Sequence, residues 1–159
     1  MKRLEVKGLV TMFNIIEFLY LHQKNNLVYY DSLTGTRSRM YYDRVVARKY
    51  QDKSVKIIYI DINNLKKVND EKGHDYGDRY VKNIADELSK IEAFDELCRV
   101  GGDEFVAICD PKSKHYEIQN VENISYGVYI KHEYETVYQA VQNADRRMYN
   151  HKKKNKEKD

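Results

Sequence analysis

Two adjacent carboxylates follow two adjacent glycines in the segment CRVGGDEFVAIC, which places Asp103 and Glu104 at the tip of an expected turn. A reversing chain can use a Gly-Gly pair, but it has no use for two like charges at its tip. A bound cation would account for them. A further carboxylate, Asp61, directly follows the apolar segment VKIIYI and can approach the turn if the two segments lie beside each other in a sheet.

Carboxylates that converge from strand ends are typical ligands of Mg²⁺. The ion keeps several waters, takes one or two protein oxygens and completes its octahedron with substrate phosphates. Two such ions can activate an attacking hydroxyl and stabilise a leaving pyrophosphate. The alternative is that Asp61 caps a turn and that Asp103 and Glu104 are solvated loop charges. For Asp61 alone this alternative is favoured, whereas the Gly-Gly turn favours the metal site for the three together.

The pattern of apolar residues predicts a small antiparallel α+β domain with its helices on one face of the sheet. Residues 55–60 are expected to form a buried strand because they are β-rich and nearly continuously apolar. Residues 61–78 are expected to form a long polar loop, and such loops in compact domains are more often functional than idle. The other expected elements are a helix ending near Gln51, a helix around 81–88, a hairpin around 101–102, a strand over 124–130 and a helix over 134–154.

Composition narrows the class of protein. The 159 residues are 42% hydrophobic and 33% charged, which suits one soluble domain. The net charge of +3 lies in the last nine residues, HKKKNKEKD, which carry five lysines against two acids, so the rest is neutral and no nucleic-acid face is expected. Cys98 and Cys109 lack metal-site spacing and are expected to be reduced core thiols of a cytoplasmic protein.

The N-terminal segment is expected to form a helix within residues 1–28, followed by the domain over 29–159. Its apolar stretch, residues 8–21, is interrupted by polar residues and is too short for a membrane span. The helix either packs on the domain or pairs with a second chain, and the two alternatives are balanced. Four apolar residues at 3-4-3 spacing carry this prediction: Leu9, Met12, Ile16 and Leu19.

From about residue 29 to residue 156, the chain resembles the GGDEF family of diguanylate cyclases, whose name residues 101–105 spell. DSLTG with Arg39 resembles the family's first motif, D-x-L-T-G-x-x-N-R, with Ser38 in place of Asn. DINNLKKVNDEKGHDYGD resembles D-[IV]-D-x-F-K-x-[IV]-N-D-x-x-G-H-x-x-G-D, and departs from it at Asn63 and Leu65. ISYGV and ADRRMYNHKKKNK resemble the family's last two motifs.

The resemblance implies a palm-like or ferredoxin-like antiparallel sheet with helices. One peripheral helix is expected to be shortened, because only 19 residues separate Phe105 from Ser125. The implied activity is that of a diguanylate cyclase using Mg²⁺ or Mn²⁺. Two domains of a homodimer face each other with one GTP each, and each 3′-hydroxyl attacks the partner's α-phosphate to give cyclic di-GMP and two pyrophosphates.

By position, the resemblance assigns metal binding to Asp61, the backbone carbonyl of Ile62 and Asp103. Asp103 is also the implied proton acceptor, and Glu104 is implied to assist with the metal. These are the expected catalytic residues.

The resemblance also implies contacts to GTP. Asn69 and Asp78 match the guanine readers, since a carboxylate can accept hydrogen bonds from the ring N1–H and exocyclic amine of guanine. Lys66, Lys152 and Lys156 match positions that contact the triphosphate, although Lys156 stands where Arg is usual. The alternative is a locally bonded turn residue for Asn69 and ordinary surface positions for the lysines. Contact is favoured for Lys66 and Lys152, and the two interpretations are balanced for Lys156.

The family's inhibitory product site has the pattern R-x-x-D a few residues before the GGDEF motif. Here Asp95 fills the acidic position, but Glu92 stands where Arg is expected. An anion there removes the main phosphate contact and repels a dianionic ligand. We therefore expect no inhibitory site at this position.

Two other functions stay open from the sequence. One is a palm-type cyclase that makes a different cyclic dinucleotide, against which Asn69 and Asp78 argue. The other is a GGDEF domain that holds GTP without turnover and signals through its helix.

Overall fold

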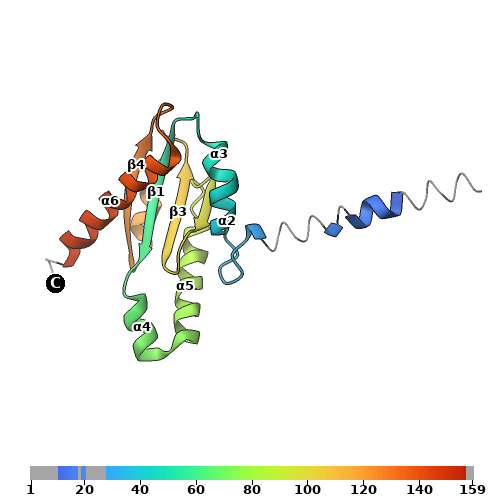
Figure 1. Ribbon diagram of the computed structural model, residues 1–159. Coiled ribbons are helices and arrows are strands. Elements are labelled where there is room, and N and C mark those ends of the chain that lie inside the picture. Colours follow the sequence, from blue (N-terminus) through green and yellow to red (C-terminus); the bar gives the residue numbers. More distant parts are fainter. Residues whose placement is uncertain (1–10, 18, 21–27, 157–159) are drawn as a thin grey trace, which may run out of the picture.

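The computed structural model of the protein describes residues 11–17, 19–20 and 28–156. Its centre is a four-stranded sheet in the order β2-β3-β1-β4, and each neighbouring pair is antiparallel (Figure 1). The strands are β1 (Val55–Ile62), β2 (Glu96–Arg99), β3 (Glu104–Cys109) and β4 (Ile124–Lys131). The antiparallel α+β fold predicted from the sequence is confirmed.

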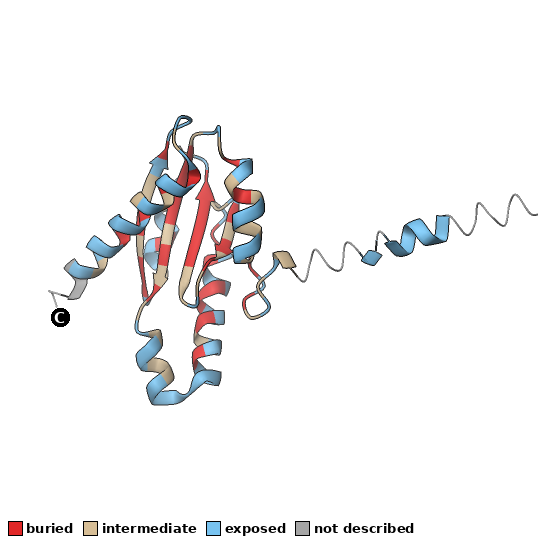
Figure 2. Cartoon of the chain, viewed as in Figure 1, coloured by how far each residue is buried: buried red, intermediate tan, exposed pale blue. Residues whose placement is uncertain are grey.

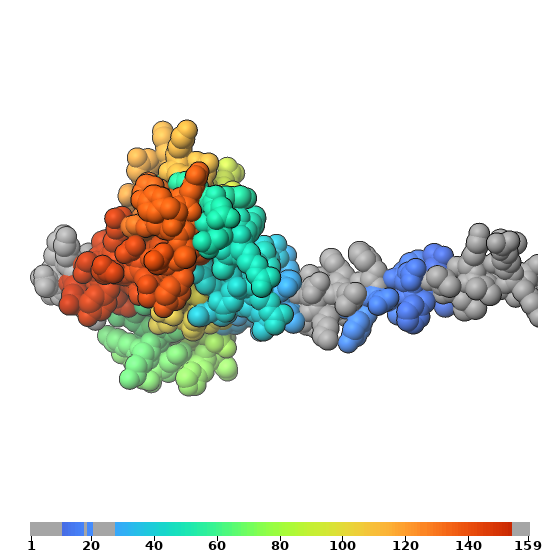
Figure 3. Space-filling model, turned by 45° about the horizontal axis from the view of Figure 1, so that its top comes forward, coloured from blue at the N-terminus to red at the C-terminus, as the bar shows by residue number. Residues whose placement is uncertain are grey.

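Helices cover both faces of the sheet, so the prediction that they lie on one face is wrong. The helices are α2 (Arg39–Tyr41), the π-helical turn η1 (Tyr42–Val46), α3 (Ala47–Lys49), α4 (Leu65–Lys72), α5 (His74–Leu88), the 3₁₀ helix η2 (Tyr116–Asn120) and α6 (Val137–Lys156). Figure 3 shows α6, in orange and red, beside the 39–49 helical segment, in cyan, on one face. The opposite face packs against α5.

Strand β1 explains why both faces need a cover. Successive side chains point to opposite faces, and Ile57 packs with Val46 and Ala140 while Ile58 packs with Val81. A nearly continuous apolar strand is typical of burial on both sides. The run VKIIYI therefore already carried the signal for two helical layers.

The predicted loop over residues 61–78 is wrong, because most of it is helical. Every residue of α4 is exposed or only partly buried, so the helix has no apolar stripe for periodicity to reveal. Gly73 separates α4 from α5 and has φ +84°, a conformation that side chains disfavour. The two helices together form a hairpin that projects beyond the sheet (Figure 1).

Two further predictions about the core are confirmed. The short connection between β3 and β4 contains η2 in place of a longer helix, and Ile118 from it is fully buried in the α5 face of the core. Cys98 and Cys109 are free and fully buried, and burial raises the pKa of the Cys98 thiol to about 12.

Residues 11–17 and 19–20 are helical, as predicted for the N-terminal segment. Met12, Ile16 and Leu19 are all more than half exposed, so they do not pack on the described part of the domain. Leu9 lies outside the described residues. None of the helices that the structure describes is long and apolar enough to cross a lipid bilayer.

Candidate functional site

The carboxylates predicted from the sequence gather at one end of the sheet. Asp61, near the end of β1, is paired with Glu104 at the start of β3. Directly opposed side chains in a sheet lie on the same face, about 5 Å apart at Cβ. Asp103 precedes Glu104 in the turn, and its backbone carbonyl accepts a hydrogen bond from the backbone N–H of Ile62 at 2.8 Å. The structure therefore brings Asp61, Ile62, Asp103 and Glu104 together.

The glycine turn holds Glu104 in place. The backbone N–H groups of Val100 and Gly101 both donate to the carbonyl oxygen of Glu104, at 2.9 and 3.2 Å. A Cβ on Gly101 would lie 2.3 Å from Oε2 of Glu104, so any side chain there would displace the carboxylate from its present position. The Gly-Gly pair thus serves the position of a carboxylate as well as the reversal of the chain.

Sequence reasoning missed Tyr59, which lies two residues before Asp61 and therefore on the same face of β1. Burial and hydrogen bonding to Glu104 raise the pKa of Tyr59 above its ordinary value. The phenol stays protonated at neutral pH and can donate to the Glu104 carboxylate. An inward aromatic residue two positions before a functional carboxylate is a signal that the sequence did contain.

Lys152 reaches the carboxylates from α6. Its ammonium group forms an ion pair with Oδ1 of Asp61. This contact depends on Gly127 in β4, where a Cβ would lie 2.2 Å from the backbone of both Ala144 and Met148. The absence of a side chain there lets α6 lie directly on β4, and the helix carries Lys152 to the end of the sheet.

The donor set fits a magnesium ion that shares its ligands with substrate. Among the described residues, no three His, Cys, Asp or Glu side chains form a group that could hold a metal by themselves. Asp61 and the carboxylates of the turn can supply one or two oxygens, which is the number that Mg²⁺ takes when phosphates and water complete its shell. The ammonium of Lys152 on Asp61 shows that this end of the sheet accommodates a cation.

The predicted guanine readers lie on the α4–α5 hairpin. Asn69 is in α4 and Asp78 is in α5, next to Gly77. A Cβ on Gly77 would lie 1.8 Å from Oδ1 of Asn69, so the amide crosses the face of α5 beside Asp78. Lys66 is an exposed residue of the first turn of α4. The side chain of Lys156 lies outside the described residues.

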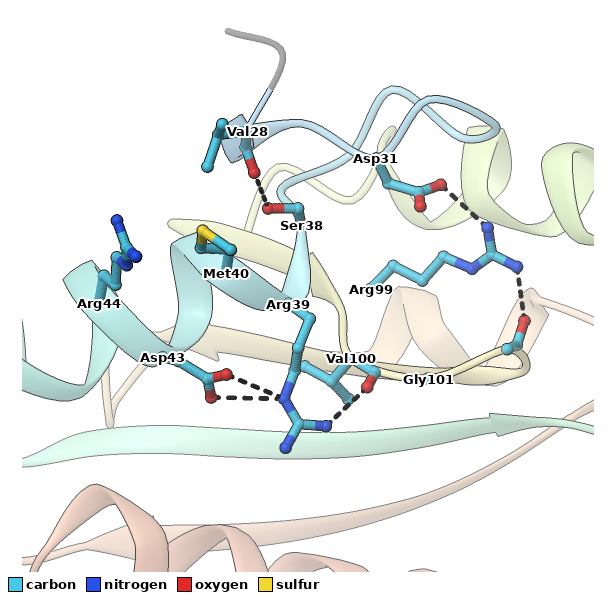
Figure 4. A pocket seen from close by; sticks show the side chains of 11 residues that line it. Val28, Asp31, Ser38, Arg39, Met40, Asp43, Arg44, Arg99, Val100 and Gly101 are labelled. Carbon is cyan, nitrogen blue, oxygen red and sulfur yellow. Dashed lines mark hydrogen bonds and ion pairs between the residues drawn. The ribbon is translucent and has the colours of Figure 1, made fainter. Parts of the chain in front are cut away.

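A second feature that sequence reasoning missed ties the turn to the incoming chain. The guanidinium group of Arg99 donates to Asp31 at 3.0 Å and to the carbonyl of Gly102 at 2.7 Å (Figure 4). Burial raises the pKa of Asp31, but hydrogen bonds from Thr34 and Arg99 outweigh it and lower that pKa overall. The pair therefore persists at neutral pH.

Ser38, which departs from the family's first motif, forms two hydrogen bonds of its own. Its hydroxyl donates to the carbonyl of Val28 at 2.6 Å and accepts from the backbone N–H of Tyr41 at 3.2 Å. The second bond caps α2. A serine at this position therefore both starts the helix and fastens the residues before it.

Among the described residues around Glu92 and Asp95, no arginine is available to take the place of the one that the inhibitory pattern requires. Glu92 is exposed, and Asp95 lines a hollow of about 260 Å³ to which Arg37 also contributes. The guanidinium carbon of Arg37 lies 4.4 Å from the ring centroids of both Tyr30 and Tyr41. Since its guanidinium already lies against two aromatic rings, Arg37 does not replace the arginine that the family has at position 92.

Known proteins share both the sequence and the fold. The family model for the GGDEF domain of diguanylate cyclases matches residues 28–122. "Diguanylate cyclase DgcS" of Shewanella oneidensis is 42% identical over 85 residues, which are 50% of this chain and 29% of DgcS. "Cyclic di-GMP phosphodiesterase PdeB" of the same organism is 32% identical over 111 residues, which are 67% of this chain and 13% of PdeB. The chain thus spans less than a third of either relative.

Among solved structures, the coiled coil and GGDEF domain of DgcB from Caulobacter crescentus, in complex with c-di-GMP, superimposes with a TM-score of 0.81. The match covers 94% of each chain at 19% identity, and it speaks for the fold alone. The family model covers more than half of the chain, and both its first motif and its glycine turn fall inside the match. The chain belongs to the GGDEF domain family.

Proposed function

We propose that the protein is a diguanylate cyclase that condenses two GTP molecules into cyclic di-GMP and two pyrophosphates. The observation that carries this proposal is the pairing of Asp61 with Glu104 beside the glycine turn, with Lys152 bound to Asp61. Degenerate family members usually lose these carboxylates. This chain has all of them, in an arrangement that can hold a divalent cation.

Each residue at the carboxylate end has a distinct role in this proposal. Asp61, Asp103 and the backbone carbonyl of Ile62 hold Mg²⁺ or Mn²⁺, and Glu104 assists. The bound ions supply positive charge that activates the 3′-hydroxyl and stabilises the leaving pyrophosphate. Asp103 accepts the proton of that hydroxyl. Tyr59, whose pKa is raised by burial and by Glu104, is proposed to donate to that carboxylate and to orient it.

The triphosphate and the base bind on two sides of these carboxylates. Lys152 already lies at Asp61, within reach of phosphates held there, and Lys66 and Lys156 are proposed to add further positive charge. Asn69 and Asp78 pair with the edge of guanine. Adenine lacks the N1–H and the 2-amino group that a carboxylate at this position would accept from. We therefore propose GTP as the substrate.

The product requires a second copy of the chain, because one site holds one GTP and the dinucleotide needs two. The N-terminal helical segment supports pairing, since Met12, Ile16 and Leu19 leave an apolar face exposed to solvent. Exposed apolar stripes of this kind are typical of helices that associate with a partner helix. The proposed active species is a homodimer.

The direct test is incubation of the purified protein with GTP and Mg²⁺, with products resolved by chromatography and identified by mass. Cyclic di-GMP and pyrophosphate in a ratio of one to two are expected. ATP and an Asp78→Ala variant provide the specificity controls: the wild-type protein should ignore ATP, and the variant should lose its preference for GTP. An unchanged GTP preference in the variant would contradict the role of Asp78.

A second candidate is a GTP-binding module without turnover. It is favoured by one observation, the match to PdeB, a protein described as a cyclic di-GMP phosphodiesterase. In that case the protein would bind GTP with Mg²⁺ and release no pyrophosphate over hours. Measuring nucleotide binding and turnover on the same preparation separates the two functions.

A further inference from the structure

A groove of about 560 Å³ lies beside the glycine turn (Figure 4). It is open to solvent and lies between the 39–49 helical segment and the β2–β3 turn. The residues that matter for its chemistry are Val28, Arg39, Met40, Arg44, Gly101 and Gly102. A volume of this size accommodates a ligand as large as a nucleotide.

The charges of the groove leave one arginine without a partner. Arg39 is bonded to Asp43 at 3.2 Å, and Arg99 to Asp31 at 3.0 Å. Arg44 is exposed, and no hydrogen bond or ion pair links it to another described residue. The charges within these two ion pairs therefore cancel, and the guanidinium of Arg44 remains as an uncompensated positive charge.

The walls of the groove suit a nucleotide. A Cβ on Gly102 would meet nothing within 4 Å, so a ligand can lie against the bare peptide of the turn. Met40 and Val28 add apolar surface on the opposite wall. Arg44 projects from the π-helical turn η1, and such turns interrupt regular helices at functional sites more often than elsewhere.

The groove adjoins the carboxylates but shares none of the residues that would hold the first GTP. Arg39 donates to the carbonyl of Val100 at 2.8 Å, and the N–H of Val100 donates to the carbonyl of Glu104 at 2.9 Å. The proposed contacts of the first nucleotide lie on β1, α4, α5, α6 and the carboxylates of the turn. The groove is built from the incoming segment, the 39–49 helical segment and the two glycines.

We propose that this groove receives the anionic part of the second GTP, the molecule that the partner copy binds, and that Arg44 is its main contact. The inference rests on the proposed function, because it needs two nucleotides to meet at one glycine turn. A guanidinium offers the forked donors that fit phosphate, and it binds best where no carboxylate already occupies it.

The test measures association of two copies rather than turnover. Sedimentation of the full chain is followed as a function of concentration, with Mg²⁺ and with or without a non-hydrolysable GTP analogue, for the wild type, Arg44→Gln and Arg48→Gln. Arg48 is an exposed arginine one turn further along the same helical segment that does not line the groove, so it is the matched control.

The analogue is expected to tighten dimerisation of the wild type and of Arg48→Gln alike. In Arg44→Gln, the increase in dimer affinity that the analogue causes should be about tenfold smaller. Binding of the analogue to dilute monomer should be equal in all three proteins. The proposal is overturned if the analogue does not promote dimerisation of the wild type, if Arg44→Gln dimerises as the wild type does, or if Arg44→Gln weakens binding to the monomer.

Product formation, measured separately, keeps this inference distinct from the proposed function. If the protein forms no cyclic di-GMP but dimerises with the analogue through Arg44, the inference about the groove stands and the proposed cyclase function fails. If the protein forms cyclic di-GMP while Arg44→Gln dimerises normally, the proposed cyclase function stands and the inference about the groove fails.

Discussion

The carboxylate end of the sheet and the α4–α5 hairpin are built in opposite ways. Asp61 extends from β1, which is hydrogen-bonded to β3 on one side and to β4 on the other and is buried for most of its length. Asn69 and Asp78 lie on a pair of helices that project past the sheet, where α4 is exposed or only partly buried throughout (Figure 2).

This difference separates chemistry from recognition. The residues proposed to hold metal rest on the hydrophobic core, so their positions are fixed by the packing that stabilises the whole domain. Asn69 rests on α4, which has no buried residue, and Asp78 lies near the start of α5, before most of the residues by which that helix packs on the sheet, so this end of the hairpin has room to adjust around a ligand. Substitutions in the two regions should therefore affect stability and nucleotide recognition differently.

The largest effect is expected from Asp103→Asn. Removing one charge from the proposed metal site should lower cyclic di-GMP synthesis by at least about 100-fold, because even residues that only support metal ligands cost up to that factor. Asp103 is only partly buried and lies in a turn outside the hydrophobic core, so the melting temperature should stay within about 2 °C. Pyrophosphate release and thermal unfolding measure the two quantities. Full activity in this variant would remove Asp103 from the site.

Gly127→Ala should damage the sheet region through packing. The new methyl group would lie 2.2 Å from the backbone of Ala144 and Met148, and backbone cannot rotate away as a side chain can. A loss of about 1–3 kcal/mol in the free energy of unfolding is expected, together with lower activity as Lys152 moves from Asp61. Gly102→Ala, where the methyl group meets nothing within 4 Å, is the control for stability in urea unfolding.

Gly77→Ala tests the other region with the same chemical change. Alanine favours the helix by up to about 1 kcal/mol, so stability should be equal or higher. The methyl group would lie 1.8 Å from Oδ1 of Asn69 and force that flexible side chain to rotate. Affinity for GTP should fall about tenfold, by calorimetry, with Lys82→Ala on the same helix as the control. A drop in stability as large as that of Gly127→Ala would erase the contrast between the regions.

The smallest effect concerns feedback. Since Glu92 replaces the arginine of the inhibitory pattern and the guanidinium of Arg37 already lies against two tyrosine rings, cyclic di-GMP should slow the wild-type protein by less than about twofold at saturating GTP. Glu92→Arg should introduce inhibition. Strong inhibition of the wild type that does not depend on Asp95 or compete with GTP would show that product binds elsewhere.

Sequence reasoning located the carboxylate end of the sheet because it follows strong local signals. The apolar strand before Asp61 and the glycine turn before Asp103 both depend on residues that are neighbours in the chain. The register added what the sequence could not: Glu104, expected only to assist, stands directly opposite Asp61. A one-residue shift of either strand would have reversed that relation.

The parts that could not be predicted depend on contacts between distant segments or on the absence of a core face. Helix α4 has no apolar stripe, so its polar sequence read as a loop. The groove around Arg44 could not be predicted, because it forms only where the 39–49 helical segment lies against the β2–β3 turn, which is distant in the chain. Both helical layers could have been inferred, because β1 is apolar on consecutive residues and not on alternate ones.

Strand β1 also determines how long the site keeps its shape. Its amide groups are bonded to neighbours on both edges, so their hydrogens can exchange with solvent only when the sheet itself comes apart. Helix α4, which has no buried residue, can fray many times in the interval between such openings. Asp61 is therefore carried by the segment that exchanges last, and the carboxylate stays in register through fluctuations that open and reform α4 beside it.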